Sequence, residues 1–114
     1  MEIAYDNFLG LEPKYSNPAQ ARYAVLPIPY EGTVSYLCGT ADGPAAIIEA
    51  SQQVELFDEE LLGEFYQAGV ATYPSIPSAK TPEEEMDCIR AAAEPILRDG
   101  KFLLSFGGEH SITA

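Results

Sequence analysis

Residues 102–113 constrain the fold of this chain more than any other stretch. Residues 102–106 are almost entirely apolar, which is typical of a parallel-sheet strand that is buried on both faces. Gly107 and Gly108 follow, and glycines permit a sharp turn that larger side chains would obstruct. The polar residues 109–111 come next, so we expect them at the carboxyl end of a strand, where open α/β sheets bind ligands.

His110 is the only histidine in the chain. Imidazole is a good ligand for divalent metals and a good acid or base near neutral pH, so His110 is a candidate functional residue. The alternative is a structural histidine whose ring is satisfied by the backbone of a glycine-rich turn. A catalytic pair of Ser111 as nucleophile and His110 as its general base is a poor hypothesis, because adjacent side chains seldom point at each other. The residues alone leave the metal and structural interpretations open.

Strand and helix patterns alternate along the chain. Besides the strand near residues 101–106, apolar segments near residues 22–28 and 68–73 predict two further strands. Helical patterns separate them, near residues 44–54 and 82–98. Because parallel strands need a crossover connection, this alternation predicts a parallel α/β sheet.

The longer helix has a clear start. Thr81 is the expected cap, Pro82 suits the first helical position, and Glu84 completes a capping box. The acidic run at residues 83–85 is favourable at the positive end of the helix dipole, so we interpret it as structural and not as a metal cluster. The expected core face consists of Met86, Ile89, Ala93, Ile96 and Leu97.

The segment 30–42 should lie on the ligand side of the sheet, because it follows a predicted strand. Tyr30, Glu31 and Thr33 are candidate pocket residues, and the alternative is ordinary turn chemistry with surface polarity. Pro44 then begins the shorter helix, whose expected apolar face consists of Ala46, Ile47, Ala50 and Val54.

Residues 1–21 are predicted to be an irregular arm with at most one turn of helix. Phe8, Leu9 and Leu11 could pin the arm to a core or to a neighbouring subunit, and packing on its own chain is the simpler interpretation. The arm is acidic at its start and lacks the apolar segment of a secretory signal.

The net charge of the chain limits the classes of partner that it can bind. The formal net charge is −12, from 18 acidic and 6 basic residues, which argues against nucleic acid and against an anionic membrane. It suits a cationic substrate, although solubility alone explains it as well. No apolar run approaches membrane-spanning length. Cys38 and Cys88 are far apart in sequence, so two free thiols are expected.

Three segments resemble the ureohydrolases, the family of arginases and agmatinases. SFGGEHSIT at residues 105–113 resembles the first metal-binding motif of that family, and Glu109, where Asp is commoner, resembles the agmatinase branch. PYEGTVSY at residues 29–36 and GPAAIIEAS at residues 43–51 also resemble agmatinases. The likeness spans roughly residues 22–113.

This resemblance implies a three-layer α/β/α fold with a parallel sheet, of which residues 1–114 form the N-terminal portion of a single domain, with residues 1–21 as its irregular arm. It implies two Mn²⁺ ions with a bridging hydroxide that attacks the guanidinium carbon of a small cationic substrate. His110 corresponds to a direct ligand of one ion. Glu109 is expected to support the ligands without binding metal.

The other ligands of the family lie in an Asp-x-His-x-Asp motif and a later Ser-x-Asp-x-Asp motif, and this sequence contains neither. One ligand cannot hold two ions, so we assign no catalytic residue in this chain and expect the isolated chain to be inactive.

For the complete parent protein, the resemblance implies hydrolysis of agmatine to putrescine and urea by a cytoplasmic homo-oligomer, a trimer or hexamer. An alternative is a non-catalytic interaction module that keeps only the front of the fold, and another is a phosphate-binding module that uses the glycine-rich turns. The reading frame downstream of Ala114 separates the first two hypotheses, because Asp-x-His-x-Asp supports the enzyme and a stop codon supports the module.

Overall fold

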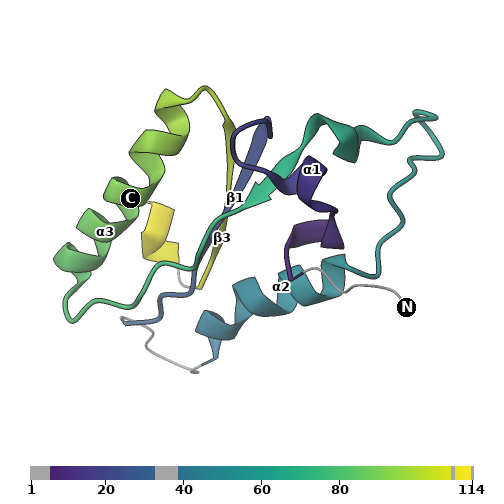
Figure 1. Ribbon diagram of the computed structural model, residues 1–114. Coiled ribbons are helices and arrows are strands. Elements are labelled where there is room, and N and C mark those ends of the chain that lie inside the picture. The colour runs from purple at the N-terminus through teal and green to yellow at the C-terminus, as the bar shows by residue number, and fades with distance from the viewer. Residues whose placement is uncertain (1–5, 33–38, 109, 114) are drawn as a thin grey trace.

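A parallel sheet of three strands forms the centre of the molecule (Figure 1). The computed structural model describes residues 6–32, 39–108 and 110–113. Strands β1 (Tyr23–Ile28), β2 (Val70–Thr72) and β3 (Phe102–Gly107) lie in the order β2-β1-β3, and both pairings are parallel. The parallel sheet predicted from the alternating pattern is confirmed.

The helices follow the predicted segments closely. Helix α3 (Pro82–Arg98) has the predicted bounds, and α2 (Gly43–Ser51) ends earlier than expected. In the described part of the arm, α1 (Pro13–Ser16) is a single turn of the predicted kind, and a further turn, the 3-10 helix η1 (Phe8–Gly10), was not predicted. Other short 3-10 helices complete the described structure: η2 (Thr40–Asp42), η3 (Phe65–Ala68) and η4 (His110–Thr113).

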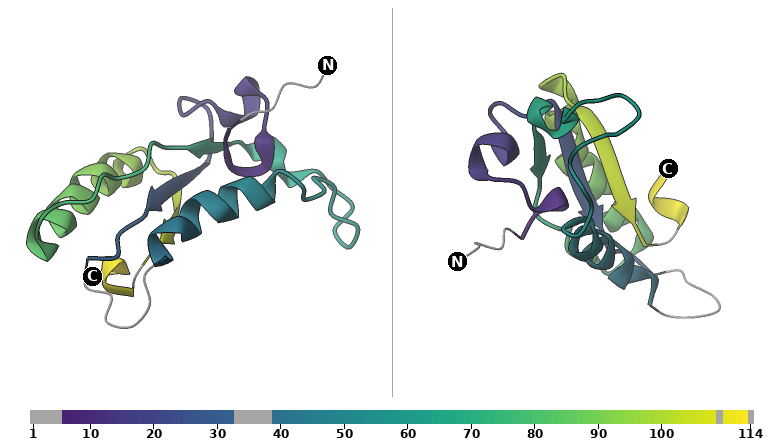
Figure 2. Two further views of the ribbon diagram at one scale, coloured as in Figure 1. Left: turned by 90° about the horizontal axis from the view of Figure 1, so that it is seen from below. Right: turned by 90° about the vertical axis from the view of Figure 1, so that its right-hand side faces the viewer.

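The central strand β1 separates two cores, because successive side chains of a strand point to opposite faces. Ala24, Leu26 and Ile28 are buried on one face, where Ile96 of α3 packs. Val25 is buried on the other face in a cluster that contains residues of the arm and of β2. Figure 2 shows α3 on one side of the sheet, and α2 with the arm on the other. The described part of the chain therefore has helical, sheet and helical layers.

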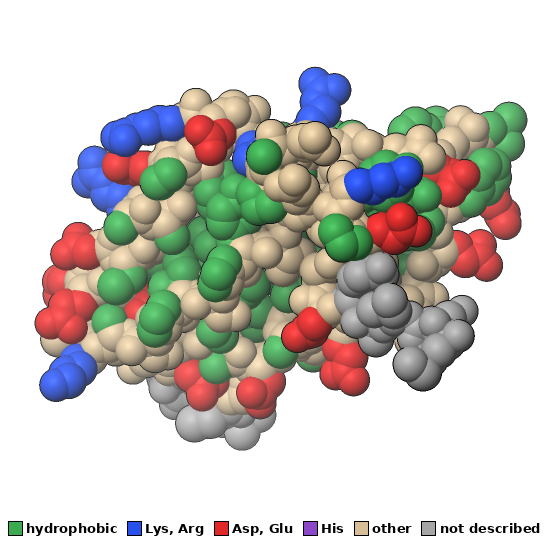
Figure 3. All heavy atoms as spheres, in the orientation of Figure 1, with side chains coloured by type: hydrophobic (Ala, Val, Ile, Leu, Met, Phe, Trp, Pro, Cys, Tyr) green, Lys and Arg blue, Asp and Glu red, His purple; other side chains and the backbone are tan. Residues whose placement is uncertain are grey.

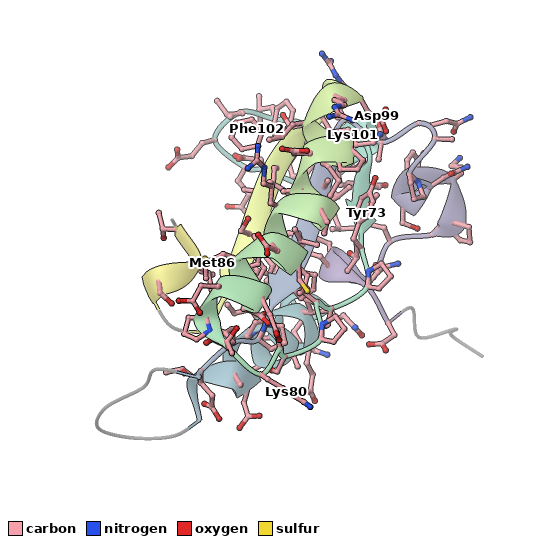
Figure 4. The ribbon with its side chains drawn as sticks, turned by 90° about the vertical axis from the view of Figure 1, so that its left-hand side faces the viewer. Tyr73, Lys80, Met86, Asp99, Lys101 and Phe102 are labelled. Carbon is pink, nitrogen blue, oxygen red and sulfur yellow. The ribbon has the colours of Figure 1, made fainter. Side chains whose placement is uncertain are left out.

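Helix α3 begins as its sequence predicts. The Thr81 hydroxyl oxygen accepts a hydrogen bond from the Glu84 amide at 3.2 Å, which satisfies an amide at the helix start. Figure 4 looks onto α3, with Met86 near its first turns and Asp99 at its far end beside Lys101 and Phe102. Ile96 is buried as expected, but placing Leu97 on the core face was wrong, because its side chain points to solvent and is 56% exposed.

The N-terminal arm packs on its own chain. The amide of Leu9 donates to the Ser51 hydroxyl oxygen at 2.8 Å, and the amide of Phe8 donates to the Thr72 hydroxyl oxygen at 2.9 Å. Leu11 is 2% exposed and belongs to the core cluster on this face of the sheet. Of the two interpretations of the arm, intramolecular packing is therefore what the described residues show.

The expected apolar face of α2 was wrong. Ile47 and Val54 are 44% and 58% exposed, whereas Pro44 and Ser51 are the buried residues of the helix. The arm explains the difference, because η1 contacts α2 and Leu9 donates its amide to Ser51. Ser51 is consequently buried although it is polar, and Ile47 remains exposed although it is apolar.

The expectation that residues 102–106 are buried on both faces was also wrong. Phe102 is 62% exposed, Ser105 is exposed, and the remaining residues of β3 are only partly buried. Within the described sheet, β3 is an outer strand that pairs with β1 alone, whereas the buried strand is the central β1.

The segment between α2 and η3 protrudes from the body of the molecule, and Figure 3 shows apolar side chains gathered on this protrusion. An antiparallel bridge joins Asp58 to Gly63, and large apolar side chains around it are exposed: Val54, Phe57, Leu61, Leu62 and Phe65.

Among the described helices, none has the length and apolarity to cross a bilayer. Cys88 is a free, exposed thiol, and Cys38 lies outside the described residues.

Candidate functional site

Strands β1 and β3 end side by side, and the chain leaves both of them at one point. Ile28 pairs with Gly107 in the last register position of the sheet. The carbonyl oxygen of Ile28 accepts hydrogen bonds from the amides of Tyr30, at 2.8 Å, and Gly108, at 3.0 Å. The two loops predicted to carry functional residues therefore begin in contact with each other.

Gly108 has no space for a side chain. A Cβ atom added at this position would lie 3.0 Å from the carbonyl carbon of Tyr30 and closer still to its carbonyl oxygen. The need for glycine in this turn was predicted from the sequence. The structure supplies the reason, which is the close approach of the Tyr30 backbone.

Tyr30 and Glu31 play different parts in this arrangement. Tyr30 is 3% exposed and belongs to the core cluster on the α3 side of the sheet, together with Leu26 and Ile76. The Glu31 carboxylate accepts hydrogen bonds from backbone amides further along the same loop. These bonds, from Ala41 first and then Gly39, hold the pKa of Glu31 below its ordinary value of 4.5.

His110 begins the short helix η4, two positions after Gly108. Ile112 of η4 packs against the core cluster on the α3 side, so this helix is anchored to the body of the molecule. The side chain of His110 lies outside the described part of the structure, as do Glu109 and Thr33. Their roles as ligand, support and pocket residue remain predictions.

The metal site requires more than the described residues provide. Within residues 6–32, 39–108 and 110–113, His, Cys, Asp and Glu side chains form no group of three or more that could hold an ion. The acidic run at residues 83–85 also forms no metal-binding group. Its last residue, Glu85, is fully buried and accepts a hydrogen bond from the Ala79 amide at 2.7 Å. The described side chains therefore do not fit a two-metal centre by themselves.

The burial of Glu85 was not predicted from the sequence. One of its carboxylate oxygens is buried without a hydrogen-bond partner in the described structure. A signal was present, because Glu85 precedes Ile89 by four positions and Ile96 by eleven, and so falls on the buried stripe of α3. Its neighbours Glu83 and Glu84 lie off that stripe and are exposed.

A hollow of 380 Å³ lies on the arm side of the sheet, also near the strand ends, and was not predicted. Pro27, Thr72, Tyr73 and Ser75 contribute to its wall, and Asp6 is the acidic residue in its lining. Burial, and to a lesser degree the charge of Asp99, raise the pKa of Tyr73 above 10.0. The hollow therefore has hydroxyl groups but no basic side chain among its lining residues.

These features define an α/β protein that presents a glycine-glycine turn, followed by a histidine, at the carboxyl edge of a parallel sheet. The sequence profile of the arginase family matches residues 21–114. The chain belongs to the arginase family, and the resemblance to ureohydrolases is confirmed.

Individual relatives agree with this assignment. The chain is 42% identical over 101 residues to an N(1)-aminopropylagmatine ureohydrolase of Synechocystis sp., which covers 83% of this chain and 33% of the relative. It is also 30% identical over 111 residues to an agmatinase of Bacillus subtilis, and this match covers 93% of this chain and 36% of the agmatinase. The chain therefore spans about a third of the length of these curated relatives.

A solved structure shows the same fold. The agmatine ureohydrolase of Thermoplasma volcanium superposes with a TM-score of 0.79 at 24% identity, over 99% of this chain and 37% of that chain. The expected arginase-like α/β fold is thus confirmed for the part of it that this chain represents.

Proposed function

We propose that residues 1–114 are the N-terminal portion of a single ureohydrolase domain, and that the complete protein hydrolyses a linear guanidino amine. The observation that carries the proposal is the Gly107–Gly108 turn, which leads from the carboxyl edge of the sheet directly to His110. In the reaction, water adds to the guanidinium carbon and the bond from that carbon to the substituted nitrogen breaks. That nitrogen takes up a proton, and the products are urea and an amine.

The proposed substrate is agmatine, which would yield putrescine and urea. Its cationic groups suit a chain with a formal net charge of −12. N(1)-aminopropylagmatine is the second candidate, because relatives with that activity in their names are 42% and 40% identical to this chain, and the agmatinase is 30% identical. Hydrolysis of that substrate would release urea and the corresponding triamine.

The proposed cofactor is a pair of Mn²⁺ ions, with His110 as a ligand of one ion and Glu109 as its support. Further ligands would come from parts of the protein beyond the described residues. When bound, such ions lower the pKa of water and polarise the group under attack. We further propose that the complete protein is a cytoplasmic homo-oligomer, a trimer or a hexamer.

Urea release tests this function. The complete product of the reading frame should be purified, loaded with Mn²⁺, and assayed with agmatine, N(1)-aminopropylagmatine and arginine. We expect urea from at least one of the two linear amines and little from arginine. The 114-residue chain alone should release none. A complete product that folds, retains metal and yet releases no urea from either amine would favour the non-catalytic interaction module.

A further inference from the structure

Glu31 joins the two ends of the loop that follows β1. One of its carboxylate oxygens, Oε2, accepts hydrogen bonds from the amide of Gly39 at 2.8 Å and from the amide of Ala41 at 3.1 Å. The hydroxyl of Thr40 donates to the same oxygen at 3.3 Å. Three donors from one short segment therefore converge on a single charged acceptor.

The two ends of this loop also contact the turn that precedes His110. At one end, the backbone of Tyr30 lies against Gly108. At the other end, a Cβ atom added at Gly43 would lie 3.4 Å from the carbonyl oxygen of Gly107. The Gly107–Gly108 turn is thus in contact with the residue before Glu31 and with the helix start that follows Ala41.

We propose that Glu31 is a positioning residue, a carboxylate clip that keeps both ends of the loop against the Gly107–Gly108 turn and so sets the backbone that carries His110. The clip itself follows from the contacts of the described residues. Its consequence for catalysis rests on the function proposed above. Glu31 acts through the backbone in this proposal and has no direct contact with the substrate.

The chemistry of the clip favours a carboxylate. All three hydrogen bonds reach an ionised oxygen, and such bonds are stronger than those between neutral groups. The direction of the Glu31 pKa shift agrees, because amides that bind the charged form lower the pKa.

Hydrogen exchange of backbone amides, measured in the complete product of the reading frame, tests the clip. In Glu31→Ala, the amides of Gly39 and Ala41 should exchange about tenfold faster, because they lose their acceptor. The amide of Gly108, bonded to Ile28, should also exchange faster if the clip holds the turn. Glu31→Gln keeps an acceptor oxygen without the charge, so its effect should be smaller. Glu49→Ala, which removes an exposed carboxylate of α2, is the matched control and should change none of the three.

The complete product of the reading frame tests the catalytic consequence. We expect Glu31→Ala to lower kcat about tenfold or more with little change in KM, and to weaken Mn²⁺ binding, because misplacement of a ligand affects both. Unchanged exchange at Gly108 in Glu31→Ala would overturn the clip. If the wild-type protein releases no urea, the proposed function fails, but the Gly108 amide still decides the clip. If Glu31→Ala does not fold, the exchange rate of the Gly108 amide is measured in Glu31→Gln instead.

Discussion

The backbone of Gly108 lies directly against the backbone of Tyr30, without room for a side chain between them. Both residues donate their amides to the carbonyl oxygen of Ile28, so the chain leaves β1 and β3 at a common point. This contact couples the loop after β1 to the turn before His110. Tyr30 and Gly108 belong to two of the three segments that resemble agmatinases, and they lie in contact although 78 positions separate them in the sequence.

Replacement of Gly108 by alanine should destabilise the protein. The new Cβ atom would overlap the Tyr30 carbonyl, and relief of that overlap requires the two loops to separate. We expect a loss of about 1–3 kcal/mol in the free energy of unfolding, measured by chemical denaturation. Gly43→Ala is the control, because its φ of −57° is helical and its Cβ would make only an ordinary contact. Equal stability of the two variants would contradict the close contact.

The Glu31 clip should fail in acid. The pKa of Glu31 is lower in the folded protein than its ordinary value of 4.5, so its contribution to stability is complete above that value and disappears as the pH falls through the folded-state pKa. The thermal unfolding midpoints of wild type and Glu31→Gln should therefore differ near neutral pH, and the difference should shrink as the pH falls from 4.5 through the lower folded-state pKa of Glu31. Glu49→Gln should follow wild type throughout. A constant difference at all pH values would show that the charge of Glu31 is not the cause.

The N-terminal arm should contribute to stability through Leu11. This side chain is 2% exposed and packs with Val25 and Val70, so Leu11→Ala leaves a cavity in the core on the arm side of the sheet. We expect a loss of about 2–5 kcal/mol in the free energy of unfolding. Leu61→Ala on the protrusion is the matched control, because Leu61 is 69% exposed, and its effect should stay within about 0.5 kcal/mol. A small effect at Leu11 would mean that the arm is not part of the core.

Local signals in the sequence were sufficient to predict the elements. Thr81 and Pro82 mark the start of α3, and the structure shows the expected cap at Thr81. The first strand was predicted near residues 22–28, and β1 covers residues 23–28 of that segment. Such signals operate over a few residues, so one sequence is enough to recognise them.

Features that depend on contacts between distant segments were not predicted. The burial of residues in β3 depends on its outer position in the sheet, which the apolar run of residues 102–106 does not reveal. The burial of Glu85 depends on the loop that ends at Ala79, whose amide it binds. The role of Glu31 likewise requires the chain to return to it at Gly39 and Ala41. The sequence made Glu31 a candidate pocket residue, with ordinary turn chemistry as the alternative, and it did not reveal what the carboxylate binds.

The last prediction concerns His110. In the complete product of the reading frame, we expect His110→Asn to weaken one Mn²⁺ site far more than the other, since the other ligands of such centres are mostly carboxylates elsewhere. In the proposed two-metal mechanism both ions prepare the attacking water, so turnover should fall by several orders of magnitude. The fold should persist, because His110 is in a short helix after the last strand and the packing of η4 is provided by Ile112.

Metal content by mass spectrometry, turnover by urea release, and circular dichroism are the measurements for this variant. Ile112→Ala is a useful comparison, since it removes the anchor of η4 and leaves the imidazole in place. It should reduce stability and affect both metal sites only indirectly. If His110→Asn kept two tightly bound Mn²⁺ ions per subunit and wild-type turnover, His110 would be a structural residue of the glycine-rich turn, and its assignment as a metal ligand would be wrong.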